Sequence, residues 1–415
     1  MKLKENLKNF PKNAKVYLLA ISFFYISMGA FNMLQGIYIK ELNIDEGFLG
    51  LILSFKTFAI AFASIPCAMI VNKIGRKKGI FLTMTLVPVL TILQGIIGNK
   101  YIILILAVLQ GASQGFLMVS EGPFLMDNSD SKNRLKLFSY SFADNVFSTM
   151  FGYFIFGELS NKLSIKVGLL TALKYSIILC GLLGLISCIF IVFIKDTKGP
   201  IKSHHNFFQN IVTLCKEPYP RKFIIYNLLI GFGAGLVVPY FNIYLRYKVN
   251  ASTSAIGIIM SLAQCSMGLG GLLTPYMAAK FGRIKTIIIC QSISIPFLML
   301  IALPPNIYIV AFALLLRNGL MNMAGPVINS LSMELIEDSK RSTYSSLNSI
   351  SNNLSRALSA MLGGYIMNTL PYGYEIPYFI TAIIYLLSTI YFYKSFFFVD
   401  KNLSKKSNKT SLVIK

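Results

Sequence analysis

The chain has no tryptophan and very little charge. Of its 415 residues, 13% are charged and 55% are hydrophobic, and only 16 are acidic against 39 Lys and Arg. Soluble domains carry about 25% charged residues, so half of the charge that would solvate a surface is missing. The same composition excludes a disordered or collagen-like chain and a disulfide scaffold. It therefore predicts a surface in contact with lipid.

Motifs of soluble catalysis and metal binding are also missing. The two histidines, His204 and His205, are adjacent, and no CxxC or HExxH pattern occurs, so no metal site is predicted. The P-loop, the GxSxG elbow and the HRD motif are equally absent, which argues against ATPases, hydrolases and kinases. Five of the six cysteines lie in apolar runs, which indicates packing residues without disulfides. We expect no cofactor and no enzymatic activity.

Long apolar runs are what the chain does contain. A bilayer core about 30 Å thick needs roughly 20 apolar residues per helix. Twelve such runs cover about 16–38, 49–71, 80–98, 101–126, 136–158, 172–194, 223–245, 253–278, 286–303, 307–330, 343–368 and 377–397. The first run is too long for a signal-peptide core, so we expect no cleavage. The chain is predicted to be an all-α integral membrane protein with twelve transmembrane helices.

The basic residues predict the orientation of these helices. With both termini placed in the cytoplasm, 29 of the 39 Lys and Arg fall in inside segments and six fall in outside loops. This bias is the positive-inside pattern of cell-membrane proteins. The net charge of +23 is therefore interpreted as a topology signal and a contact with anionic lipid, and we expect no nucleic-acid partner.

Four segments follow from the spacing of the runs. Residues 1–194 are predicted to form an N-terminal six-helix bundle, 195–222 a cytoplasmic linker and 223–400 a C-terminal six-helix bundle. Residues 401–415 are a polar, Lys-rich tail that we expect to be disordered. Within the linker, apolar residues of 204–217 fall on one helical face, which predicts a short helix on the membrane surface.

The two halves repeat each other at an offset of 207 residues. The run from Lys73 to Arg76 recurs from Lys280 to Arg283. The same offset connects further identical pairs: Gly50 and Gly257, Ser54 and Ser261, Arg134 and Arg341, Ser139 and Ser346, Asn145 and Asn352, and Gly157 and Gly364. Six spans per half, an even number, give both copies the same orientation. The repeat is therefore parallel, with its axis along the membrane normal.

The repeated loop resembles a family signature. The segment from Ala68 to Lys78 resembles the GxxxDRxGRRK loop of the major facilitator superfamily, and 275–285 is similar to its weaker second copy. The run from Leu109 to Gly111 resembles part of that family's fourth-span motif. The resemblance covers essentially the whole chain. It implies two parallel-repeat six-helix bundles and a monomeric secondary transporter that works by alternating access.

That resemblance also implies a motif at the inner gate. In the family geometry Arg76 would meet Asp127, and Arg283 would meet Glu334, while Gly75 and Gly282 allow the sharp turns. Asn72, beside Lys73, and Ala279 stand where the family has Asp, and Ala107 stands near the position of its usual Arg partner, so that further pair is expected to be absent. The alternative for the motif's arginines is positive charge that sets topology alone.

Six ionisable residues fall inside the predicted spans, where each needs an explanation because charge in hydrocarbon is costly. They are Lys56, Glu121, Asp144, Lys174, Arg317 and Arg356. At 1.5 Å per residue, Glu121 lies about 9 Å and Asp144 about 15 Å from the inner face, whereas the bases other than Lys174 lie about 22–25 Å up. Lys174 is near a span end and is expected to snorkel. The acids are thus low and the bases high.

Polar neighbours extend this set of candidates. Asp144 belongs to a stripe whose second copy lacks the charge, so we expect a proton-coupling or substrate role for it, with helix packing as the alternative. Glu121 and Arg317 are the other coupling or substrate candidates. Cavity or interface candidates are Gln110, Gln114, Asn145, Asn318, Asn352, Arg356, Lys56, Tyr240 and Asn242. The three high bases could also form an electropositive mouth that draws in anions.

The resemblance and these charges predict a proton-coupled transporter of a small solute, with efflux of small organic compounds or drugs preferred. The family's fifth-span antiporter motif, GxxxGPxxGG, is absent, which argues against proton-antiport drug efflux without excluding it. Uptake or exchange of an organic anion or sugar is the alternative. A non-transporting scaffold or receptor on the same fold, and a membrane enzyme, are two further alternatives from other classes.

Overall fold

The computed structural model describes residues 10–130, 133–195, 214, 216–303, 306–337 and 340–413. The surface helix predicted within 204–217 lies almost wholly outside the described residues. All regular structure in the described ranges is helical.

Twelve long helices account for the described chain, which confirms the all-helical prediction. The first half contains α2 (Lys12–Glu41), α3 (Glu46–Ile74), α4 (Arg76–Ile96), α5 (Lys100–Asp127), α6 (Arg134–Val167) and α7 (Leu169–Val192). The second half contains α9 (Pro218–Val237), α11 (Thr253–Phe281), α12 (Arg283–Ala302), α13 (Ile307–Leu335), α14 (Arg341–Thr369) and α15 (Ile376–Val413). Three short turns extend α9 without a loop: η1 (Val238–Tyr240), α10 (Phe241–Ile243) and η2 (Tyr244–Lys248).

Ten of the twelve helices are long and apolar enough to cross a membrane, and α6 and α14 are the more polar two. Each of these two packs against the opposite half, α6 on α11 and α14 on α3. A helix that faces protein on one side needs fewer apolar residues than one surrounded by lipid. The polar stripes around Asp144 and Asn352 therefore lie on the helices that form the interface between the halves.

Equivalent caps start equivalent helices in the two halves. The side chain of Asp45 accepts from the Phe48 N–H at 2.8 Å at the start of α3, and Ser252 caps α11 in the same way. Asn99 caps α5 and Asn306 caps α13. Each pair is 207 residues apart, so the repeat extends to the helix ends. A side-chain oxygen at this position satisfies a backbone N–H that has no partner within the helix.

The seventh helix is interrupted around Pro239. Its α-helical geometry changes at Val238 and continues as 3₁₀, α and π turns to Lys248. Proline lacks a backbone N–H and its ring clashes with the preceding turn, so it breaks the regular ladder. The break exposes irregular backbone next to the cavity described below.

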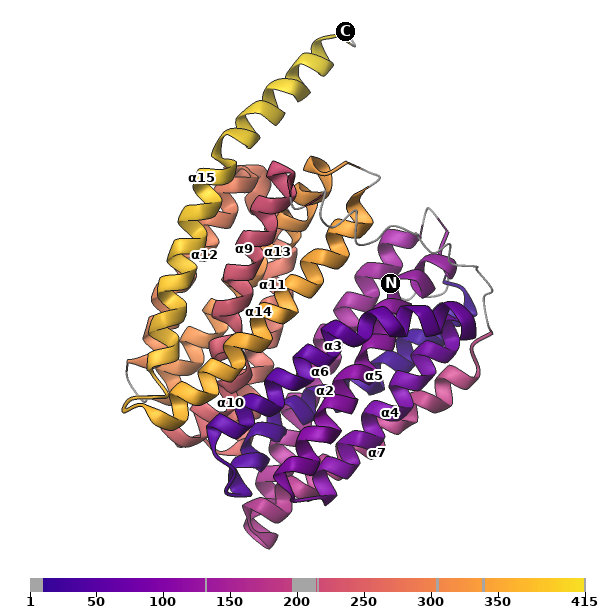
Figure 1. Cartoon of the computed structure of the whole chain (residues 1–415), viewed down its shortest axis with the longest axis vertical. Helices are drawn as coiled ribbons and strands as arrows, with labels where there is room; N and C mark the ends of the chain where they lie inside the picture. Colours follow the sequence, from indigo (N-terminus) through magenta and orange to yellow (C-terminus); the bar gives the residue numbers. More distant parts are fainter. Residues whose placement is uncertain are drawn as a thin grey trace, which may run out of the picture.

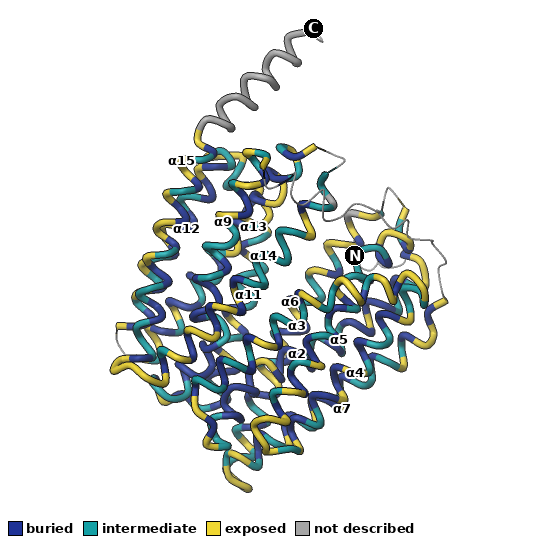
Figure 2. The backbone as a smooth tube through the Cα atoms, viewed as in Figure 1, coloured by how far each residue is buried: buried dark blue, intermediate teal, exposed yellow. Residues whose placement is uncertain are grey.

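The two six-helix bundles converge at one end and separate toward the other (Figure 1). We call the end that holds the start of α2 and the end of α15 the terminal end, and the opposite end the sealed end. Two apolar clusters near the sealed end contain residues of both halves. The clusters nearer the terminal end belong to one half each. Figure 2 shows buried backbone where the bundles meet.

Two glycine contacts bring the halves together at the sealed end. A Cβ on Gly157 would lie 2.9 Å from the Gly257 Cα, and a Cβ on Gly364 would lie 2.8 Å from the Gly50 Cα. Under the offset of 207 each contact maps onto the other. Both interfaces, α6 with α11 and α3 with α14, are therefore closed by backbone approach that a larger residue would prevent.

Hydrogen bonds reinforce this closure. Five side-chain hydrogen bonds connect the halves within the described ranges: Asn242 to the Met33 carbonyl, Ser261 to the Met150 carbonyl, Ser254 to Glu158, Tyr247 to Glu41, and Tyr374 to Glu46. All involve residues in the middle of the helices or at the sealed end. None of the described bonds between the halves lies at the terminal end.

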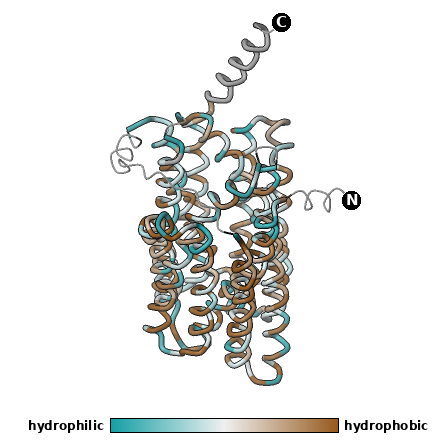
Figure 3. Tube along the Cα trace, turned by 90° about the vertical axis from the view of Figure 1, so that its right-hand side faces the viewer, coloured by the Kyte–Doolittle hydropathy of each residue, from teal (hydrophilic) through white to brown (hydrophobic). Residues whose placement is uncertain are grey.

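The outer surface is apolar along the middle of the helices, and hydrophilic residues are more frequent at the helix ends and in the loops (Figure 3). Large apolar side chains such as Phe62, Leu272 and Ile383 are more than half exposed there. A contiguous apolar surface of this kind needs lipid around it. The charge deficit of the sequence thus corresponds to a lipid-facing belt.

The C-terminal tail differs from its prediction. α15 continues to Val413, so the segment from Lys401 is helical where disorder was expected (Figure 1). The segment has no Pro or Gly. A helix that already exists adds residues without the cost of a new nucleus, and this explains the extension.

Both arginine–carboxylate pairs of the repeated loop are present. Arg76 donates to Asp127 and, at 3.1 Å, to the Pro123 carbonyl, and Arg283 lies 2.5 Å from Glu334. Gly75 and Gly282 have φ angles of 95° and 85°, which a side chain disfavours. Asn72 and Lys73 are exposed at the end of α3.

Each of these pairs lies within one half, and their part in closing an inner gate stays a prediction. Arg76 and Asp127 join α4 to α5 within the first half, and the second pair joins α12 to α13 within the second half. Neither pair crosses between the halves. They therefore brace the terminal end of each bundle while the bundles themselves stay apart there.

We predict that Arg76→Ala lowers the free energy of unfolding by about 1 kcal/mol, because it leaves a half-buried carboxylate without its partner. Lys78, exposed on the same turn, is the matched control, and Lys78→Ala should leave the melting temperature unchanged. The charge swap Arg76→Asp with Asp127→Arg should recover part of the loss. Thermal unfolding in detergent measures all three, and equal effects of the two alanine variants would contradict the pairing.

A second prediction concerns the glycine contacts. Gly157→Ala should push α6 away from α11 and expose a thiol placed at Ser261, which is buried in that interface. In a cysteine-free background, Ser261→Cys should then react several-fold faster with a maleimide. Gly271→Ala is the control, because nothing lies within 4 Å of a Cβ at Gly271. An unchanged alkylation rate would show that this approach does not hold the halves together.

Candidate solute cavity

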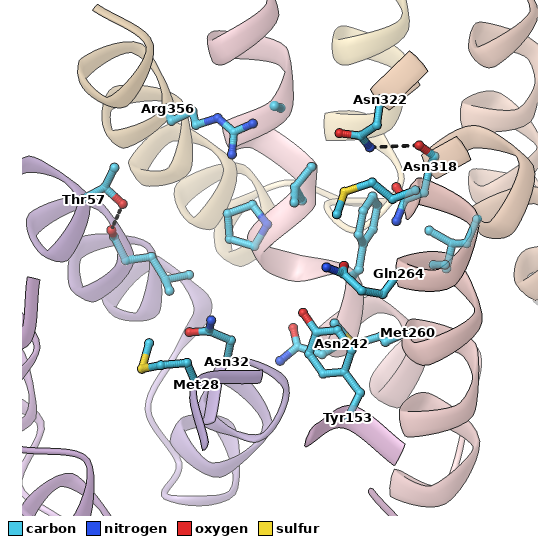
Figure 4. Close-up of a pocket in the computed structure, with 18 of the residues that line it drawn as sticks. Met28, Asn32, Thr57, Tyr153, Asn242, Met260, Gln264, Asn318, Asn322 and Arg356 are labelled. Carbon is cyan, nitrogen blue, oxygen red and sulfur yellow. Dashed lines mark hydrogen bonds between the residues drawn. The ribbon is translucent and has the colours of Figure 1, made fainter. Parts of the chain in front are cut away.

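A cavity of about 520 Å³ lies between the two halves. Residues of α2, α3, α5 and α6 line it from the first half, and residues of α9, α11, α13 and α14, with the interrupted segment, line it from the second. Figure 4 shows side chains of both halves directed toward this space. We call it the sealed-side chamber. Its volume is in the range of pockets that hold drug-sized molecules.

A second cavity of about 420 Å³ adjoins the first. The two share the lining residues Met28, Asn32, Ile60, Gln114 and Gln264, so they are parts of one continuous space. The second part contains Glu121, which lies toward the terminal end of α5. We call it the terminal-side chamber.

Opposite charges occupy the two chambers. Lys56, Arg317 and Arg356 line the sealed-side chamber, and Glu121 lines the terminal-side chamber. The depth order expected from helix rise is therefore present along the cavity. Among the described lining residues, no acid borders the sealed-side chamber and no base borders the other.

Arg317 is held by uncharged neighbours. Its guanidinium donates to the Asn318 side-chain oxygen at 3.0 Å and to the Tyr385 hydroxyl at 3.3 Å. It also lies 5.3 Å from the centre of the Phe241 ring. Its Nε is buried and has no partner among the described residues. The contacts fix the guanidinium in place but leave its charge without a counter-ion.

Glu121 interacts with the side chains of Ser141 on α6 and Tyr17 on α2. The Ser141 hydroxyl donates to one carboxylate oxygen at 3.0 Å and connects α5 to α6. The residue is partly buried and borders the terminal-side chamber. A solute or proton that enters this chamber can therefore reach the carboxylate.

Asp144 lies beside the cavity and does not line either chamber. Ser22 on α2 and Ser148 on α6 donate to the same carboxylate oxygen at 2.7 and 3.0 Å. The other oxygen, Oδ2, is buried without a partner among the described residues. This arrangement links two helices of the first half, as the packing alternative requires, and leaves one oxygen available to carry a proton.

The remaining candidates separate into two groups. Gln114, Asn145, Asn318 and Asn242 border one or both chambers. Gln110, Asn352 and Tyr240 do not, since they bond to Thr91, to the Asn227 carbonyl and to the Ala360 carbonyl respectively. Gln110 and Asn352 turn into the interior of their own halves. Tyr240 lies at the interface, near Gly50.

Several lining residues were not identified from the sequence. Asn32, Gln35, Thr57 and Gln264 border the cavity. The repeat could have indicated three of them, because the offset of 207 connects Gln35 with Asn242 and Thr57 with Gln264, and both members of each pair are polar. Two-fold arrangement of the halves brings both members of each pair to the same space.

Comparison with known proteins supports this architecture. A sequence model of the Major Facilitator Superfamily matches the chain twice, over residues 17–226 and 223–413. The chain is 24% identical over 259 residues to the quinolone resistance protein NorA of Staphylococcus aureus. That match covers 60% of the chain and 63% of the relative's length.

Solved structures share the fold at lower sequence identity. The nucleoside transporter NupG superposes with a TM-score of 0.77 at 13% identity, over 93% of this chain and 99% of that one. A bacterial homologue of the human lysosomal transporter Spinster, in an inward-facing and occupied conformation, superposes with a TM-score of 0.73 at 13% identity, over 92% and 96%. With the family model matching both halves, the chain belongs to the Major Facilitator Superfamily and is a multi-pass membrane protein.

Proposed function

We propose that the protein is a proton-coupled secondary transporter that exports small organic compounds from the cell by alternating access. The observation that carries this proposal is the polar cavity between the halves, lined by both of them and separated from one end by close helix contacts. A solute site at the repeat interface is what a rocking motion of two halves can expose to each side in turn.

The direction of opening follows from the charge bias of the loops. The terminal end carries most Lys and Arg, so it faces the cytoplasm by the positive-inside rule. The described conformation is then open to the inside and closed to the outside. Opening outward would require the glycine contacts at the sealed end to separate and the terminal ends to approach.

Export of organic compounds is favoured by the relative that confers quinolone resistance. The nucleoside transporter among the solved structures supports the fold alone, because its identity to this chain is 13%. A scaffold or receptor on the same fold would bind a ligand without flux. Uptake or exchange of an organic anion is the second candidate, and the three cations of the sealed-side chamber favour it.

For the coupling site we place Glu121 first and Asp144 second. Glu121 borders the terminal-side chamber, so a proton can reach it from the open side. Asp144 borders neither chamber, and its Oδ2 has no partner among the described residues. A carboxyl that is exposed alternately to the two sides can load a proton from one and release it to the other.

We predict that Glu121→Gln abolishes proton-driven accumulation of a fluorescent quinolone in proteoliposomes and leaves exchange across equal pH partly intact. The amide mimics the protonated acid, so the site can still change conformation but cannot take up a proton. Asp144→Asn is the matched comparison and should have a smaller effect if this carboxyl mainly joins α2 to α6. Accumulation that persists in Glu121→Gln and fails in Asp144→Asn would assign the coupling to Asp144.

A further inference from the structure

The three cations of the sealed-side chamber come from both halves of the protein. Lys56 lies on α3, Arg317 on α13 and Arg356 on α14. Lys56 is 7% and Arg317 is 3% exposed. Arg356 projects into the chamber from its helix (Figure 4). A molecule in the chamber would therefore meet positive charge from both halves.

No carboxylate neutralises these cations within the described part of the chain. None of them forms an ion pair there, whereas Lys40, Lys248, Arg76 and Arg283 all do. The described residues that line the chamber include no Asp or Glu. Lys56 and Arg317 are buried, whereas Arg356 is exposed. A buried cation without a partner is unfavourable, so Lys56 and Arg317 require a compensating interaction.

Uncharged contacts compensate only in part. Lys56 lies 5.1 Å above the centre of the Phe31 ring, and Arg317 lies near the rings of Phe241 and Tyr385. Ring contacts of this kind stabilise a cation modestly and hold its orientation. They leave hydrogen-bond donors of Arg317 unsatisfied, since its Nε has no described partner.

We propose that the sealed-side chamber binds the anionic group of an organic solute, a carboxylate or a phosphate, between Lys56 on one half and the two arginines on the other. As a statement about the transported solute, this rests on the proposed function. Planar guanidinium groups match the oxygens of either anion. The apolar body of the solute would lie against Met28, Met260 and Met267, which line the same space.

The location on both halves has a consequence for the transport cycle. In an intermediate that is closed at both ends, the chamber is enclosed and its cations lose contact with bulk water. This is unfavourable when the chamber is empty, and an anion beside the cations reverses the sign of the interaction. The anionic solute is therefore expected to favour the closed intermediate more than a neutral analogue does.

The absence of tryptophan allows a direct test on the full-length protein in a neutral maltoside detergent. Phe241→Trp places the only fluorophore of its kind beside Arg317. Quenching by iodide is measured against quenching by caesium and by neutral acrylamide. We expect iodide to quench the Phe241→Trp protein about threefold more strongly than the same protein that also carries Arg356→Gln or Lys56→Gln. The reason is that the cations raise the local concentration of anions. Lys174→Gln, outside the chamber, is the control.

Competition identifies the anionic group. Benzoate or phenyl phosphate should protect the fluorophore from iodide, and benzamide, which is similar in shape but neutral, should not. Protection by only one of the two assigns the carboxylate or the phosphate. Iodide quenching that is unchanged in both charge-neutralised variants overturns the proposal. If the protein shows the expected iodide quenching but transports no quinolone in proteoliposomes, the proposed export function is wrong and the anion site remains.

Discussion

Close approach of helix backbones at four glycines governs how the two halves meet. Gly157 against Gly257 and Gly50 against Gly364 bring α6 to α11 and α3 to α14 with no room for a side chain. The contacts are equivalent under the internal repeat, so they close both interfaces at the same depth. The polar cavity and the separated terminal ends follow from this closure, because rigid bundles joined at one end diverge toward the other.

The cavity then separates charge along its length. Cations lie toward the closed end and Glu121 toward the open end, in two chambers that share five lining residues. The protein could have paired these groups, as it pairs Arg76 with Asp127 near the loops. Keeping them apart maintains charges that a solute and a proton can each engage. Leaving these charges unpaired lowers the stability of the empty protein, and a bound anion would restore part of it.

Much of the fold could be predicted from the sequence because lipid imposes strong constraints. Twelve apolar runs, the repeat offset and the pairs Arg76–Asp127 and Arg283–Glu334 were all identified, and each pair forms. Both members of each pair belong to one half, as the resemblance implied, and their part in closing an inner gate stays a prediction.

The sequence alone determined the helical membrane architecture, the family and the depth order of the ionisable residues, because apolar length and helix rise are properties of single helices. Tertiary structure decided which polar residues reach the cavity. Gln110 and Gln114 lie one turn apart on α5, yet the first bonds to Thr91 and the second borders both chambers. Asp144 borders neither chamber, whereas Glu121 borders the terminal-side one. Such differences depend on the rotation of each helix against its neighbours, and that rotation is set by packing between segments far apart in the chain.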